Sequence, residues 1–144
     1  MDYVAQNAAA RDRILALVRG LSEEQLQTRV GEHWTVAVAL AHLAFWDRVH
    51  VGRLRRALTD GLAAPPPLPD GLTDVINDGE LFTWRRLPGR TAVELFESSS
   101  GDADAFLASL DAATVEAVRA AGVPRLVERF RHRTEHGDSI EQAL

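Results

Sequence analysis

Three of the five histidines in this chain lie where the ligands of a metal ion would be expected. His132 and His136 are four residues apart in a segment expected to be helical, so both imidazoles project from one side of that helix. His42 is the single polar residue within the apolar run of residues 36–46. A third imidazole from a neighbouring helix would complete three protein ligands and leave positions open for water or substrate. Catalytic zinc-type sites are built in this way.

Each part of this pattern also has a simpler interpretation. The His132 and His136 pair could be solvated on an arginine-rich helix surface, and His42 alone could be a hydrogen-bonded core histidine. The two parts together favour a metal, because leaving an imidazole unpaired in an apolar environment costs roughly 1–3 kcal/mol. A cation shared by the three rings would remove that cost. We therefore predict a metal site with His42, His132 and His136 as its ligands.

The other two histidines are weaker candidates for the same site. His33 precedes the predicted helix cap at Thr35 and is expected in a loop. His50 is eight residues after His42, about 80° around the same helix, so it could approach the same cleft one layer along. Partial exposure beside Arg53 is the expectation for His50.

Nearby charged and aromatic residues could support the site. Asp47 and Glu135 could accept a hydrogen bond from the outer N–H of a ligand histidine, although surface positions are favoured for both. Trp46, Arg48 and Arg129 could line a pocket beside the metal. The sequence identifies no catalytic or cofactor-binding residue beyond the three proposed ligands.

Composition excludes several classes of protein. The net charge of −5 argues against a nucleic-acid partner, which would require a basic face. The chain has no cysteine, so a metal site must use imidazole and oxygen ligands. The N-terminus lacks a basic start followed by an apolar core, and no apolar run approaches the ~20 residues that span a bilayer. We expect a cytoplasmic protein with no membrane partner.

Glycine and proline divide the chain into helical segments, and no segment shows sustained strand alternation. Ser22 and Gln25 fit a capping box that opens one short turn, and Thr91 with Glu94 fits a second box. Pro124 suits the first turn of a final helix. Helices are predicted over residues 4–19, 35–60, 73–86, 91–110, 111–121 and 124–144.

These segments predict an all-α fold. The proline-rich residues 62–70 cannot be helical and are expected to form a long crossover loop. Four main helices with short extra helices indicate a four-helix bundle that forms a single domain over residues 1–144. The core stripe of the last helix is predicted to be Phe130, Gly137, Ile140 and Leu144, with the two histidines on its flank.

Several pieces of the sequence together resemble the DinB-like superfamily. They are the segment 21–26 (LSEEQL), the segment 34–36 (WTV) leading into 41–43 (AHL) and 45–48 (FWDR), and the distal His132-x-x-x-His136 followed by Ile140 and Leu144. The resemblance is to the branch of the mycothiol-dependent maleylpyruvate isomerase N-terminal domain, over about residues 11–144. It implies a four-helix bundle holding a divalent metal, usually zinc or nickel, on three histidines. Carried onto this sequence, those ligands are again His42, His132 and His136.

The resemblance also implies a class of function. Characterised members are thiol S-transferases or isomerases that use mycothiol, bacillithiol or glutathione. A metal-dependent transferase would activate such a thiol and pass it to an electrophilic small molecule, and the lack of cysteine fits a sulfur supplied by that co-substrate. One alternative is a non-catalytic bundle that binds a metal or small molecule. Another is a structural bundle with incidental histidines. Apolar faces on the short helices could also pair in a homodimer.

Overall fold

Helices make up nearly all of residues 2–144, the part of the chain that the computed structural model describes. Seven α-helices, one 3₁₀ helix and one hairpin occur in this part. In chain order they are α1 (Tyr3–Val18), α2 (Glu23–Leu26), β1 (Arg29–Val30), β2 (Trp34–Thr35), α3 (Val36–Thr59), α4 (Leu72–Trp84), α5 (Gly89–Ala108), α6 (Ala112–Ala120), η1 (Pro124–Leu126) and α7 (Phe130–Ala143). The predicted all-α bundle is confirmed.

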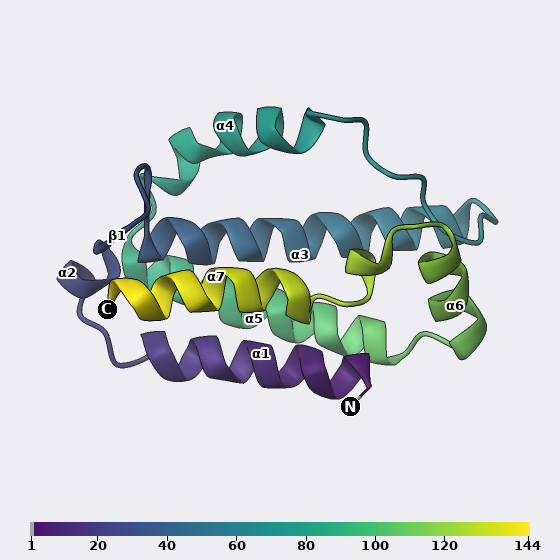
Figure 1. Cartoon of the computed structure of the whole chain (residues 1–144), viewed down its shortest axis with the longest axis horizontal. Helices are drawn as coiled ribbons and strands as arrows, with labels where there is room; N and C mark the ends of the chain where they lie inside the picture. Colours follow the sequence, from purple (N-terminus) through teal and green to yellow (C-terminus); the bar gives the residue numbers. More distant parts are fainter. Residues whose placement is uncertain (1) are drawn as a thin grey trace.

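The four long helices α1, α3, α5 and α7 form the bundle (Figure 1). α3 packs against α5 and α7, and α1 packs against the same two helices from the other side. α4 lies outside this group, along α3, and the predicted crossover loop connects it to the end of α3 (Figure 1). None of the described helices has the length and apolar character needed to cross a membrane.

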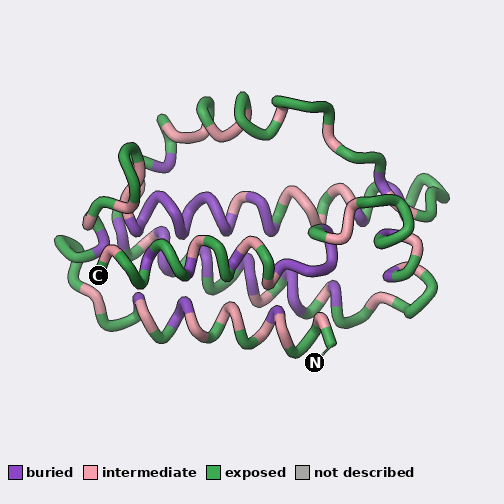
Figure 2. The backbone as a smooth tube through the Cα atoms, in the orientation of Figure 1, coloured by how far each residue is buried: buried purple, intermediate pink, exposed green. Residues whose placement is uncertain are grey.

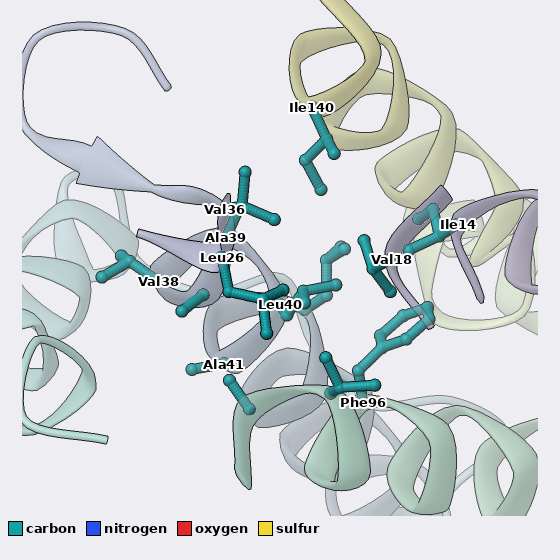
Figure 3. Close-up of a cluster of buried hydrophobic side chains, with 14 of the residues drawn as sticks. Ile14, Val18, Leu26, Val36, Val38, Ala39, Leu40, Ala41, Phe96 and Ile140 are labelled. Atoms are coloured by element: carbon teal, nitrogen blue, oxygen red, sulfur yellow. The ribbon is translucent and has the colours of Figure 1, made fainter. Parts of the chain in front are cut away.

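The main core lies where the four long helices meet (Figure 3). Ile14 and Val18 from α1, Leu40 from α3, Phe96 from α5 and Ile140 from α7 are all fully buried there. The first half of α3 is buried on every side, as its apolar run predicts, whereas its second half alternates between buried and exposed residues (Figure 2). Burial of this apolar surface is the main stabilising contribution to the fold.

A small hairpin between α2 and α3 was not expected, because neither strand is long enough to show alternation. β1 and β2 pair antiparallel, with Arg29 opposite Thr35 and Val30 opposite Trp34. Gly31 forms the turn with a φ of 67°, a conformation that favours glycine. The hairpin brings Trp34 to the start of α3.

The predicted capping box at Ser22 is confirmed. The Ser22 hydroxyl accepts a hydrogen bond from the Gln25 N–H, and the Gln25 side chain accepts one from the Ser22 N–H. Thr35 caps α3 as predicted, because its hydroxyl accepts from the Val38 N–H at 3.1 Å. Both caps satisfy donors that a helix start leaves without partners.

The second predicted capping box, at Thr91 and Glu94, is wrong. α5 begins earlier, at Gly89, and its first residues receive no local side-chain cap. The carboxylate of Glu23, in α2, accepts hydrogen bonds from the N–H groups of Gly89 and Arg90 instead. A Cβ at Gly89 would lie 2.7 Å from the Leu26 Cβ, so glycine permits this close approach. The cap comes from a distant residue, which a search for local spacing does not find.

The predicted start of the final helix, at Pro124, is also wrong. Pro124 opens the short 3₁₀ helix η1, and α7 begins at Phe130. Asn7, buried in α1, determines this start. Its side-chain oxygen accepts from the Phe130 N–H at 2.7 Å, and its NH₂ donates to the Val127 carbonyl at 2.9 Å.

The predicted core stripe of α7 is partly correct. Gly137 and Ile140 are buried, Phe130 is half-buried, and Leu144 is 52% exposed because the helix ends at Ala143. A Cβ at Gly137 would lie 3.3 Å from Ile14 Cγ1. The glycine therefore allows α1 and α7 to approach closely.

Candidate metal centre

The structure brings His42, His132 and His136 together between α3 and α7. One ring nitrogen from each lies within 4.8 Å of the others. The three ring centroids are 4.7 to 4.8 Å apart in every pair. Nε2 of His42 lies 2.8 Å from Nε2 of His132. The three histidines singled out from the sequence therefore form one cluster.

The helical period of α7 places its two histidines beside the core rather than in it. Arg133, Gly137 and Ile140 are buried and face the bundle interior. His132 and His136 each precede one of these residues, so both are turned by about 100° toward one flank. They are half-buried there, as the sequence predicted for residues that line a cleft between helices.

Arg129 fixes the orientation of His132. Its Nη2 donates to Nδ1 of His132 at 3.0 Å. Because a guanidinium has no acceptor, the Nδ1 lone pair accepts this bond. In the neutral ring Nε2 then carries the proton, and it donates to Nε2 of His42 at 2.8 Å. Arg129 is held in turn by Asp47, whose Oδ1 accepts from the Arg129 Nε at 2.8 Å.

Asp47 is not a surface charge, and that expectation is wrong. It is fully buried, and its second oxygen accepts from the Arg133 Nη2 at 3.0 Å. Arg133 is also fully buried and donates through Nη1 to Asp104 at 2.8 Å. Asp47, Asp104, Arg129 and Arg133 form the ion-pair network between α3, α5 and α7. Burial raises the pKa of Asp104 and lowers that of Arg129, although the opposite charges act against both shifts.

The sequence did contain a signal for Arg133. The residue is four positions before Gly137, so it falls on the predicted core stripe of α7. Arginine is rarely buried without a charged partner, and the partners of Arg133 come from two other helices, so the stripe alone does not predict its burial. Arg129 was considered only as a pocket residue.

Two tryptophans enclose the histidines. Trp34, from the hairpin, stacks on His136 with ring centroids 5.4 Å apart and an angle of 12° between the rings. Its centroid is also 4.6 Å from that of His42. Trp84, at the end of α4, meets His42 edge-on at 5.4 Å. These contacts restrict the orientations of the His42 and His136 rings.

A cavity of ≈ 690 Å³ opens beside the histidines, and Trp34 lines it together with them. Trp46 and Arg129 line it, as predicted, whereas Arg48 is exposed and does not. Trp46 donates from its indole N–H to Asn77 of α4 at 2.8 Å. His50 also lines the cavity and is half-buried beside Arg53, as expected.

The remaining candidates lie at the edge of the site or outside it. Glu135 lines the cavity but pairs with Arg125 at 2.6 Å, with both side chains about half exposed, which agrees with a surface position. His33 has 74% of its side chain exposed and takes no part in the cluster.

The environment keeps the clustered histidines neutral. Burial is the largest cause in each case. It lowers the pKa of His42 to about 3, with the charges of His136 and Arg129 adding to the effect. It lowers the pKa of His136 to about 4 and that of His50 to about 2. Burial and the Arg129 charge also lower the pKa of His132. A neutral imidazole has one lone pair, which is the form that binds a metal. On His132 that lone pair is at Nδ1 while Arg129 donates to it, so binding through Nε2 requires Arg129 to release Nδ1 and the proton to move there.

The cluster fits the requirements of a divalent transition metal. Imidazole nitrogens bind zinc-type ions at about 2.0–2.1 Å, so the ligand nitrogens of one site lie about 3–4 Å apart. The three nitrogens here are close to that spacing and belong to a type of ligand that zinc, nickel and copper accept. Nδ1 of His42 has no hydrogen-bond partner among residues 2–144, so no protein group holds that ring in place by a hydrogen bond from its outer nitrogen.

Comparison with known families agrees with this geometry. A family model described as the DinB superfamily matches residues 6–136, a span that includes all three histidines. The searches of curated proteins and of solved structures found no match.

Proposed function

The chain belongs to the DinB superfamily, and on that premise we propose that it is a divalent-metal-dependent thiol S-transferase. In this proposal His42, His132 and His136 hold zinc or nickel. A low-molecular-weight thiol of the mycothiol type is activated at the metal and transferred to an electrophilic small molecule. The proposal includes a place in the branch of the mycothiol-dependent maleylpyruvate isomerase N-terminal domain, which the sequence segments quoted above support.

One observation carries the proposal: three neutral imidazoles from two helices meet at the wall of a cavity large enough for small molecules. Three protein ligands leave coordination positions open, and the cavity lies where an incoming ligand would need to enter. A cluster closed on all sides would support a structural role instead.

The protein groups have distinct roles in this proposal. When bound, the divalent metal supplies Lewis acidity and lowers the pKa of a coordinated thiol. Arg129 orients His132, and stacking on Trp34 orients His136. Trp46 offers an apolar wall beside the histidines. The sulfur comes from the thiol co-substrate, because the chain has no cysteine.

Metal content tests the ligand assignment. We expect elemental analysis of tag-free protein, purified without chelator, to find about one equivalent of zinc or nickel per chain. H132A and H136A should each lose most of this metal. H33A is the matched control, because His33 is exposed and lies outside the cluster. Protein without metal that takes up none on titration would contradict the proposal.

Turnover separates the transferase from a bundle that only binds. Metal-loaded protein is mixed with a low-molecular-weight thiol and an epoxide or haloaromatic electrophile, and loss of free thiol is followed over time. The proposal predicts a rate above that of the chelated protein and of H132A. Metal at full occupancy with no rate enhancement across thiols and electrophiles would identify a metal-binding module of the same family.

A further inference from the structure

The charge around the cavity is opposite in sign to that of the whole chain. The chain has a net charge of −5, yet the charged residues lining the cavity are three arginines and one glutamate: Arg53, Arg125, Arg129 and Glu135. Glu135 pairs with Arg125, and Arg129 pairs with the buried Asp47. Arg53 is therefore the cavity arginine that forms no ion pair within the described residues 2–144.

Arg53 is held in place by groups that leave its charge uncompensated. Its Nη2 donates to the Pro66 carbonyl at 2.6 Å, and its Nη1 lies 3.4 Å from Nδ1 of His50. The Pro66 carbonyl carries no charge, and the His50 imidazole is neutral because burial lowers its pKa. Burial lowers the pKa of Arg53 because the cavity solvates its charge poorly. The attraction between such a guanidinium and an anion is stronger than that between a fully exposed guanidinium and the same anion.

The position of Arg53 on α3 defines the geometry of the site. Arg53 is eleven residues after His42, so the two side chains leave the helix on nearly the same face, about 16 Å apart along its axis. Trp46 lies between them and lines the same cavity. The cavity therefore has metal ligands at one end, an aromatic wall in the middle and an unpaired cation at the other end.

We propose that Arg53 forms a carboxylate-binding subsite, and that the electrophilic substrate is an elongated molecule with a carboxylate at the end remote from the reacting carbon. This inference rests on the proposed function, since it places the reacting end of that substrate at the three histidines. A single guanidinium that already donates to a carbonyl suits a carboxylate better than a phosphate dianion, which would need more donors.

The test compares ligands that differ only in the remote group. The full chain as purified is titrated with 8-mercaptooctanoate and with 8-mercapto-1-octanol, whose thiols are identical. Binding is followed by calorimetry and by tryptophan fluorescence. We expect the acid to bind at least tenfold more tightly than the alcohol. R53Q should reduce this ratio to near one, and R53K, which keeps the charge, should retain part of it.

The matched control is R56Q, on the same helix but exposed and outside the cavity. It should keep the full preference for the acid, and circular dichroism checks that each variant is folded. Equal binding of acid and alcohol by the unmodified chain overturns the subsite. A preference that survives in folded R53Q also overturns it.

A second titration separates this inference from the proposed function. Chelator-treated protein is titrated with octanoate and 1-octanol, which have no thiol and meet no metal. A preference for octanoate that R53Q removes would support the subsite even if the protein proved to bind no metal. A chain that binds one metal per protomer but shows no preference in either titration would keep the metal centre and lose the subsite.

Discussion

Two polar clusters lie next to each other between α3 and α7, and they differ in how completely their groups are paired. In the ion-pair network each carboxylate pairs with two arginines: Asp47 with Arg129 and Arg133, and Asp104 with Arg133 and the partly buried Arg11. The histidine cluster has ring nitrogens that face one another across a few ångströms, with no carboxylate among them. In the first cluster every carboxylate is paired with arginine, although Arg133 Nε has no hydrogen-bond partner among residues 2–144, whereas the second cluster consists of imidazoles that could hold a metal ion.

Arg129 connects the two clusters. It donates to Asp47 on one side and to His132 on the other. The paired network therefore acts as the support of the unpaired one, because it fixes the arginine that orients a proposed metal ligand. A histidine that binds a metal usually donates its outer N–H to an acceptor, so Arg129 has to move off Nδ1 before Nε2 of His132 can bind one. The difference agrees with a stabilising role for the ion-pair network and with the proposed metal-binding role for the histidines.

The largest expected effect follows from breaking the paired network. D47A leaves Arg129 and Arg133 buried without one of their carboxylates, and loss of one partner in a buried ion pair costs roughly 3–5 kcal/mol. We expect the free energy of unfolding to fall by about that amount in urea denaturation. D70N, in an exposed loop position, is the control and should change stability by less than about 0.5 kcal/mol. A D47A protein as stable as the unmodified chain would show that the network does not support the fold.

A smaller effect is expected when a metal is added to the unpaired cluster. A ligand that binds only the folded state at 100 times its Kd raises the free energy of unfolding by about 2.7 kcal/mol. Chelated protein should gain this stability from zinc in thermal or urea unfolding. H33A should gain equally, and H132A should gain little. An equal gain in H132A would place the zinc elsewhere on the chain and remove the contrast between the two clusters.

The sequence predicts the main helices and the two parts of the histidine cluster because these depend on local periodicity. The apolar run around His42 requires a buried helix, and the spacing of His132 and His136 requires a shared helix face. The capping box at Ser22 is local in the same sense. Each of these features is contained within about three helical turns.

The features that the sequence does not predict depend on residues far apart in the chain. The cap of α5 comes from Glu23, and the start of α7 depends on Asn7. Asp47 looks like a surface charge until Arg129 and Arg133 pack against it from α7. Nothing in the local sequence distinguishes such a carboxylate from a solvated one, because its partners are brought to it only by the tertiary fold.

The smallest expected effect is the change of metal affinity with pH. Protons compete with a metal for imidazole lone pairs only below the histidine pKa values, which are about 3 for His42 and about 4 for His136 and are lowered for His132 as well. We therefore expect zinc affinity to change by less than about tenfold between pH 7 and pH 5. Three histidines of ordinary pKa near 6.5 would lose several orders of magnitude over that range. Competition with a chromophoric chelator at each pH measures the affinity.

The lowered histidine pKa values also make the stability of the fold depend on pH, so the zinc measurement needs a check of folding. The unfolded chain takes up protons on its histidines below about pH 6.5, while the folded chain does not, so the free energy of unfolding decreases as pH falls. Circular dichroism at pH 5 must therefore show that the protein is still folded. A steep loss of zinc affinity by folded protein between pH 7 and pH 5 would mean that the histidines are well solvated. The cluster would then differ from the buried ion-pair network in burial as well as in pairing.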